Sequence, residues 1–199
     1  MGLREKTVIL FSGDNGTAKF GADGMNIQGR RVNGMKGTLL EGGSRVPLLA
    51  SWKGTLPAGR VVHDLIDFSD FFATFADLAG ASLPAGVTLD SRSFSPQLRG
   101  EKGAPREWVF VQLGARWYVR DRNWKLTESG GLFEMTDAPF VEKSVPAGAS
   151  DEASRVARQR LQAVLAQLSP DTGKKPTDEP KPGATAKKKL RKKNRAAKG

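Results

Sequence analysis

The chain has 199 residues, of which 38% are hydrophobic, and this length allows one ordinary domain with a packed core and a tail. Its formal net charge is +11, but residues 171–199 hold eleven Lys or Arg against three acidic residues, so the remainder is nearly balanced. The absence of cysteine excludes disulfides and thiolate metal sites. We expect no membrane span, because no segment is apolar enough, and we find no secretory leader; the chain by itself leaves the cellular location unassigned.

Residues 7–12 are predicted to form a strand buried on both faces, because an unbroken apolar run ends abruptly in Ser-Gly-Asp-Asn-Gly. Asp14 and Asn15 therefore follow the carboxyl end of a strand, where open α/β sheets bind ligands. Their oxygens are suitable ligands for a hard cation. Asp-Asn-Gly is also ordinary turn chemistry, so the tripeptide alone leaves a simple turn open.

A glycine-punctuated loop covers residues 17–34, and the segment Lys-Gly-Thr-Leu-Leu-Glu-Gly-Gly-Ser-Arg-Val-Pro follows at 36–47. With the strand and Asp-Asn-Gly before it, this segment resembles the formylglycine-dependent sulfatases, relatives of alkaline phosphatase. Their later half carries a strand ending in Asp-Asn-Gly and then Lys-Gly-Thr-x-x-Glu-Gly-Gly-x-Arg-Val-Pro. The resemblance continues in residues 62–80, 89–94, 119–126 and 132–135, to about residue 145.

The resemblance implies an enzymatic site in which Asp14 and Asn15 are metal ligands of one calcium ion, completed by residues outside this chain. Lys36 would contact the sulfate of the substrate, a sulfated small molecule or glycan. The implied activity is calcium-dependent hydrolysis of sulfate esters, and the implied location is periplasmic or secreted. The implied fold is α/β: the C-terminal part of an alkaline-phosphatase-like sulfatase fold, with the end of a large mixed sheet, helices, a small antiparallel sheet and a C-terminal helix.

The chain lacks the sulfatase nucleophile, a formylglycine made from Cys or Ser within Cys/Ser-x-Pro-x-Arg. It has no cysteine, and its Ser-x-Pro triplets at Ser82 and Ser144 have Gly where the motif requires Arg. The family's paired acidic calcium ligands and active-site histidines are also absent, and the single histidine, His63, is predicted to lie at the surface or behind the site. We expect that the chain begins in the middle of a sulfatase and that the missing N-terminal half is a partner.

Two acidic and two basic residues in or near this loop have open roles. Asp23 and Glu41 could add oxygen ligands, although their spacing does not bring them together. Arg30 and Arg31 could form a positive rim with Lys36 for an anionic ester, or be ordinary solvated surface charge.

The next elements follow from periodicity. Residues 46–52 are predicted to form a strand, and apolar residues from 67 to 79 recur at helical spacing before Gly80 ends the helix. This helix is expected to cover one face of the sheet with its phenylalanines in the core. Short β-rich runs separated by hairpin breakers then predict a small antiparallel sheet, with strands at 108–113, 117–120, 124–127 and 132–135.

A final helix is predicted from Ser150 as N-cap, with Asp151 and Glu152 in its first turn. One of its faces carries apolar residues and should pack on the small sheet: Ala157, Leu161, Val164, Leu165 and Leu168. We therefore divide the chain into residues 1–100 of the catalytic domain, a small-sheet subdomain at 101–169, and a disordered basic tail at 170–199.

Two alternatives to a sulfatase remain open. One is a phosphatase or phosphonate hydrolase of the same superfamily, although its two-zinc members place histidines around the metals, and Asp-Asn-Gly with a following Lys-Gly motif fits them poorly. The other is a non-catalytic remnant whose basic tail binds polyanions by counterion release. No aromatic residues are interleaved with the lysines of this tail, so specific nucleic-acid binding is not expected.

Overall fold

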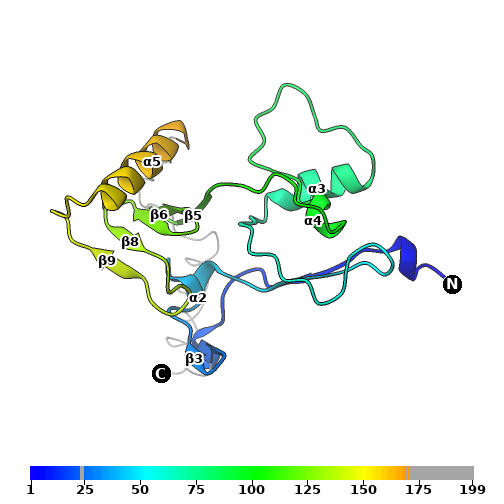
Figure 1. The fold of residues 1–199 in the computed structure, drawn as a ribbon, viewed down its shortest axis with the longest axis horizontal. Coiled ribbons are helices and arrows are strands. Elements are labelled where there is room, and N and C mark those ends of the chain that lie inside the picture. Colours follow the sequence, from blue (N-terminus) through cyan, green and yellow to red (C-terminus); the bar gives the residue numbers. More distant parts are fainter. Residues whose placement is uncertain (23–24, 169, 171–199) are drawn as a thin grey trace, which may run out of the picture.

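The computed structural model describes residues 1–22, 25–168 and 170. The predicted tail at 170–199 therefore lies outside the described residues, apart from residue 170. Two assemblies are evident in Figure 1, one around α3 and α4 and the other a five-stranded sheet with α5, and an extended N-terminal segment runs beneath both. The short helix α2 (Glu41–Ser44) lies beside the five-stranded sheet.

The N-terminal segment has two small sheets. Strand β1 (Ile9–Ser12) pairs antiparallel with β4 (Leu48–Ser51), and β2 (Asn26–Ile27) pairs with β3 (Arg30–Arg31). The first turn of the chain is a 3₁₀ helix, η1 (Arg4–Lys6), and α1 (Lys19–Ala22) precedes β2. Both strands predicted in this part, at 7–12 and 46–52, are confirmed.

The prediction that the first strand is buried on both faces is wrong for this chain. Ile9 is 50% exposed and Phe11 62% exposed, and Leu49, opposite Phe11 in the register, is 63% exposed. Side chains alternate along a strand, so these three lie on one face of the β1–β4 pair. Among the described residues, no helix or strand makes substantial contact with β1 or β4 apart from the pairing of these two strands.

Helix α3 (Asp70–Leu78) forms where it was predicted, but its surroundings differ from the expectation. Its main partner is α4 (Ser95–Leu98) and not the β1–β4 sheet. Phe71 is half-buried against Phe94 at 5.3 Å between ring centroids, whereas Phe68, Phe72 and Phe75 are each more than half exposed. The prediction that the phenylalanines form a core is therefore wrong for three of them.

A buried ion pair fastens the start of α3. The guanidinium of Arg106 donates to both carboxylate oxygens of Asp70, at 2.9 and 2.5 Å. The same carboxylate accepts from the backbone N–H groups of Asp67 and Arg92, and Arg106 also donates to the carbonyl of Asp90. Because these partners come from three separate segments, at 67–70, 90–92 and 106, the pair joins α3 to the chain that enters the five-stranded sheet.

The five-stranded sheet is a continuous antiparallel meander of β5 (Val109–Leu113), β6 (Arg116–Arg120), β7 (Trp124–Thr127), β8 (Leu132–Glu134) and β9 (Lys143–Val145). The first four strands confirm the sequence prediction, and β9 was not predicted. Its three residues are too short a run to give an alternating pattern, and only pairing with β8 makes them a strand.

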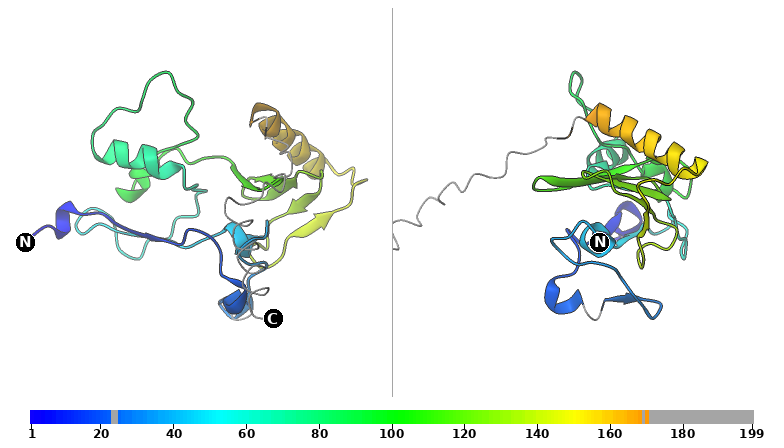
Figure 2. Two further views of the ribbon diagram at one scale, coloured as in Figure 1. Left: turned by 180° about the vertical axis from the view of Figure 1, so that it is seen from behind. Right: turned by 90° about the vertical axis from the view of Figure 1, so that its left-hand side faces the viewer.

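Helix α5 (Glu152–Leu168) lies across one face of this sheet, as Figure 2 shows. The shared core contains Val119, Leu126 and Leu132 from the sheet and Leu161 and Val164 from the helix. The apolar face predicted for this helix is confirmed. Its predicted cap is wrong, because the side chain that accepts from the backbone N–H of Ser154, at 2.9 Å, belongs to Asp151 and not to Ser150. That bond lowers the pKa of Asp151, which is the ordinary electrostatics of a helix N-terminus.

Candidate functional site

The two sequence motifs form one structural unit. The backbone N–H of Gly16, at the end of Asp-Asn-Gly, donates to the carbonyl of Gly43 at 3.1 Å, and the N–H of Lys36 donates to the carbonyl of Thr17 at 2.9 Å. We call residues 36–43 the lysine loop and residues 14–16 the Asp-Asn-Gly turn. These two backbone bonds hold the turn against both ends of the lysine loop.

Glycines make this close approach possible. A Cβ on Gly16 would lie 1.8 Å from the carbonyl oxygen of Gly42, and a Cβ on Gly43 would lie 2.1 Å from that of Thr38. A Cβ on Gly42 would lie 2.5 Å from the carbonyl oxygen of Gly34. The glycines at these positions are therefore required by packing, because a Cβ at any of them would overlap a backbone carbonyl oxygen.

The three residues predicted for the site reach solvent at this junction. Asp14 and Lys36 are exposed and Asn15 is half-buried, and the turn directly follows the carboxyl end of β1. The structure thus brings together the segments that carry them. The roles of Asp14 and Asn15 as calcium ligands and of Lys36 as a sulfate contact stay predictions from sequence.

Oxygen donors on this turn suit calcium in kind but not in number. Asp14 and Asn15 supply carboxylate and amide oxygens, while calcium takes six to eight oxygens. Among the described residues there is no group of three or more His, Cys, Asp or Glu side chains that could hold a metal ion. The turn therefore fits as one part of a calcium site whose other ligands lie elsewhere.

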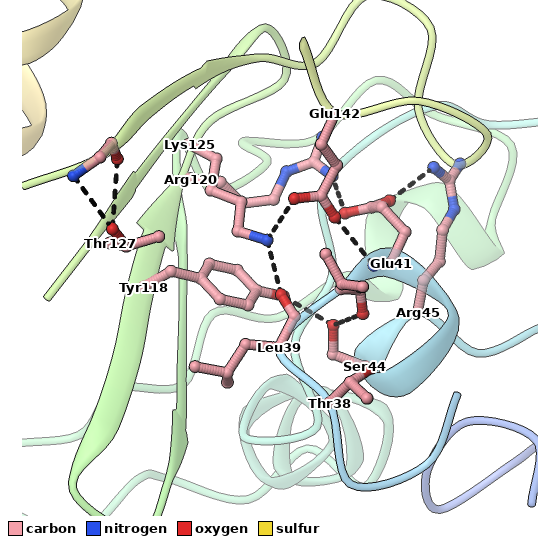
Figure 3. Close-up of polar contacts among 12 residues, drawn as sticks. Thr38, Leu39, Glu41, Ser44, Arg45, Tyr118, Arg120, Lys125, Thr127 and Glu142 are labelled. Carbon is pink, nitrogen blue, oxygen red and sulfur yellow. Dashed lines mark hydrogen bonds and ion pairs between the residues drawn. The ribbon is translucent and has the colours of Figure 1, made fainter. Parts of the chain in front are cut away.

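Glu41 has a structural role that sequence reasoning missed. It was considered as a further metal ligand, but its side chain is buried and forms ion pairs with Arg120 and, at 3.1 Å, with Arg45 (Figure 3). Each oxygen of this carboxylate therefore already accepts from a guanidinium group. The other candidate, Asp23, lies outside the described residues.

A second buried ion pair lies beside the first. The Lys125 ammonium is 2.6 Å from the Glu142 carboxylate and donates to the carbonyl of Leu39 at 2.5 Å. The other oxygen of Glu142 accepts from the backbone N–H of Glu41 at 3.0 Å. Sequence gave one signal for this cluster, namely a lysine within the apolar run of β7, but that signal does not identify its partners.

Tyr118 completes the buried cluster on β6. Its ring lies 4.3 Å from the Lys125 ammonium, and its hydroxyl is 2.6 Å from the hydroxyl of Ser44 (Figure 3). Burial raises the pKa of Tyr118 to about 12, although the hydrogen bond with Ser44 acts in the opposite direction. The phenol is therefore a neutral hydrogen-bonding group under ordinary conditions.

The other candidate cations, Arg30 and Arg31, and the single histidine lie at the surface. Arg30 makes two hydrogen bonds to Asp137, at 2.8 and 2.7 Å, and lies 4.0 Å above the ring of Phe140. Its guanidinium thereby lowers the pKa of Asp137. His63 is exposed, which confirms the surface alternative, and its carbonyl accepts from Arg122 at 2.7 Å.

Comparison with known proteins finds similarity to sulfatases. The family model described as "Sulfatase" matches residues 1–81, the part that contains both motifs. Mouse steryl-sulfatase is 36% identical over 135 residues, and human arylsulfatase A is 42% identical over 110 residues. The part of the chain that carries both motifs matches the sulfatase family.

The chain covers only part of the length of these relatives. The two alignments include 63% and 55% of this chain but 22% and 21% of the relatives, so the chain spans about a fifth of their length. Dog N-acetylgalactosamine-6-sulfatase, 36% identical over 98 residues, gives a similar share of 19%.

Solved structures of sulfatases have the same fold. A structure titled a 2-O GAG sulfatase aligns over 86% of this chain and 38% of its own, with a TM-score of 0.63 and 22% identity. Another, in complex with its substrate D-glucosamine-2-N,6-O-disulfate, aligns over 84% of this chain and 36% of its own, with a TM-score of 0.63 and 19% identity. At these identities the likeness concerns the fold, and it confirms the α/β sulfatase fold expected from sequence. Among the described residues there is no helix that is long and apolar enough to cross a membrane.

Proposed function

We propose that this chain supplies part of the active site of a sulfuric ester hydrolase, with calcium as cofactor and a sulfated small molecule or glycan as substrate. The observation that carries the proposal is the docking of the Asp-Asn-Gly turn onto the lysine loop through the Gly16–Gly43 and Lys36–Thr17 backbone bonds. Two oxygen ligands and one cation are thereby presented from neighbouring backbone segments, which suits a doubly charged metal and a sulfate group that share one site.

Asp14 and Asn15 would hold calcium together with ligands outside this chain. When bound, the ion supplies a Lewis acid that stabilises negative charge on the sulfate oxygens. Lys36 would place its ammonium against another sulfate oxygen and favour the more highly charged transition state. Its flexible stem can follow the oxygen as charge develops, while its backbone stays fixed by Thr17.

The nucleophile would come from outside these residues. The chain has no cysteine, and the two Ser-x-Pro triplets at Ser82 and Ser144 do not continue to Arg. Ser144 lies in β9 and pairs with Phe133 of β8, a position within the sheet of the C-terminal subdomain. The proposed active site is therefore composite, with these residues forming one side.

Uncovered apolar surface supports the same proposal. Ile9, Phe11 and Leu49 form an exposed face of the β1–β4 pair, and both strands have only one neighbour within the described residues. Phe72 and Phe75 form a second exposed apolar area on α3. Such surfaces usually mark a missing interface. We propose that the remaining part of the sulfatase catalytic domain covers them.

The test is hydrolysis of 4-nitrophenyl sulfate by a complete sulfatase polypeptide that contains these residues, with calcium present. Lys36→Ala should lower kcat by about 100- to 1,000-fold, the range found when one preorganised charge-stabilising donor is removed. Lys102→Ala is the matched control, because Lys102 is also exposed and lies far along the chain from both motifs. Equal turnover of Lys36→Ala and the control would remove Lys36 from the site.

The same assay distinguishes the second enzymatic possibility. Preference for 4-nitrophenyl phosphate, together with reactivation of the metal-free enzyme by zinc and not by calcium, would indicate a phosphatase or phosphonate hydrolase. Asp14→Ala should raise the calcium concentration needed for half-maximal activity, because one anionic ligand is lost. An unchanged calcium dependence would exclude Asp14 as a ligand.

A further inference from the structure

The lysine loop rests on a buried layer of charge contributed by the C-terminal subdomain. Two acids and two bases form this layer, and their exposed fractions are 2% for Glu41, 2% for Lys125 and 8% for Arg120, with 3% for the Glu142 side chain. The charges balance, so no net charge is buried. Arg120 and Lys125 come from β6 and β7, and Glu142 precedes β9.

The contacts of this layer go to the backbone of the loop. Lys125 donates to the carbonyl of Leu39, and Glu142 accepts from the N–H of Glu41, the first residue of α2. At the other end of α2, the hydroxyl of Tyr118 bonds that of Ser44. Both ends of α2 are therefore bonded by side chains in or next to the sheet, and these contacts span 74 to 101 positions of the chain.

A buried ionic layer of this kind contributes little net stability. Taking charges out of water costs several kcal/mol per ion, and apolar residues of similar volume often stabilise a fold as well or better. What charged groups supply is directional bonds with one fixed geometry. Here the bonds fix the positions of two backbone groups that no apolar side chain could hold.

The fixed backbone continues directly into the proposed site. Between Leu39 and Lys36, the N–H and hydroxyl of Thr38 both bond the carbonyl of Met35, at 3.0 and 2.7 Å. On the opposite side, Lys36 and Gly43 bond the segment that carries the Asp-Asn-Gly turn. A continuous set of hydrogen bonds thus connects Lys125 and Glu142 to the backbone that presents Lys36, Asp14 and Asn15.

We propose that Lys125 and Glu142 are positioning residues: they set the lysine loop, and through it the Asp-Asn-Gly turn, in the geometry required for sulfate ester hydrolysis. The inference rests on the proposed function for its chemical consequence, but the coupling itself is a property of this chain. It assigns the C-terminal subdomain a role in the reaction, because misplacement of a reacting group by about 1 Å can cost a factor of about 100 in rate.

The test is amide hydrogen exchange of the full chain carrying Lys125→Met, which keeps an apolar stem and removes the ammonium. The amides of Gly16 and Lys36, which do not contact Lys125, should exchange at least about ten-fold faster, while those of Val119 and Leu161 in the core keep their rates. Lys143→Met is the matched control, because Lys143 is 76% exposed and pairs with Glu134 at the surface of the same sheet. Unchanged exchange at Gly16 and Lys36 would overturn the proposal.

Two further variants separate positioning from general damage. Lys125→Cys can be alkylated with 2-bromoethylamine in denaturant and refolded, and the modification is unique because the chain has no cysteine. The restored amine should return slow exchange to Gly16 and Lys36; failure to do so in a folded product would overturn the proposal. If Lys125→Met does not fold, Glu142→Gln decides, since it retains an acceptor for the N–H of Glu41 but loses the charge that holds Lys125.

The amide-exchange test of the positioning role and the turnover test of the proposed function have separate outcomes. Faster loop exchange in Lys125→Met with no effect of Lys36→Ala on turnover would refute the proposed function and leave the coupling intact. Loss of turnover in Lys36→Ala with unchanged loop exchange in Lys125→Met would refute the positioning role alone. If both proposals hold, Lys125→Met in the complete enzyme should lower kcat at least about ten-fold.

Discussion

Alkaline titration of Tyr118 tests the buried layer behind the lysine loop. Tyr118 is the single tyrosine of the chain, is 2% exposed, and bonds Ser44. Burial raises its pKa from 10.0 to about 12. The folded state therefore binds the phenolic proton more tightly than the unfolded state does.

This shift sets a window of pH in which stability falls. The contribution is fully present below about pH 10, and is lost as pH rises through about 12, because the unfolded chain ionises first. Two pKa units correspond to about 2.7 kcal/mol, and one unit, reached near pH 11, to about 1.4 kcal/mol. These values are of the same order as one or two hydrogen bonds, so the effect is measurable against the total stability of a domain.

The assay is absorbance at 295 nm, where tyrosinate is detected, followed by urea unfolding at pH 9, 10 and 11. The tyrosinate signal should appear near pH 10 in 6 M guanidinium chloride and close to two units higher in the folded chain. Tyr118→Phe should lose less stability than the parent chain between pH 9 and 11. A midpoint near pH 10 with the near-UV tryptophan signal intact would show that the hydroxyl reaches solvent, and the reasoning would fail.

Two further substitutions test the packing that supports the site. Arg106→Met should destabilise the chain by about 3–5 kcal/mol in urea unfolding, because it leaves Asp70 charged and buried. Arg116→Met should change stability by less than about 1 kcal/mol, because the Arg116 side chain is 73% exposed in its pair with Glu128. Gly43→Ala should cost about 1–3 kcal/mol, since the new Cβ would lie 2.1 Å from a carbonyl oxygen, while Gly148→Ala has nothing within 4 Å and should be nearly neutral. Similar losses in either variant and its control would contradict the contacts described.

Local sequence determined the elements and the motif that identifies the family. Hairpin breakers at Gly114, at 121–123 and at 130–131 separate four β-rich runs, and each became a strand. The helical spacing of Ala157, Leu161 and Val164 predicted the buried face of α5. These properties depend on turn chemistry and on periodicity within a few residues, so they can be read without knowledge of the fold.

Tertiary structure decided what each element contacts. The spacing of Phe68, Phe72 and Phe75 correctly predicted a helix but wrongly predicted a core, because periodicity records an apolar face and not whether another surface covers it. The capping residue of α5 likewise depended on where the helical backbone begins. Asp151, and not the neighbouring Ser150, accepts from the backbone N–H of Ser154.

The candidate site divides in the same way. Asp14, Asn15 and Lys36 could be proposed from sequence because each lies within a recognisable short motif. Lys125 and Glu142 could not, since Glu142 meets the backbone of Glu41 across 101 positions of the chain, and nothing local to either residue encodes that contact. Sequence alone determines which groups are available for chemistry, whereas folding decides which of them are brought within hydrogen-bonding distance, because the free energy of a buried contact depends on partners that only the packed chain supplies.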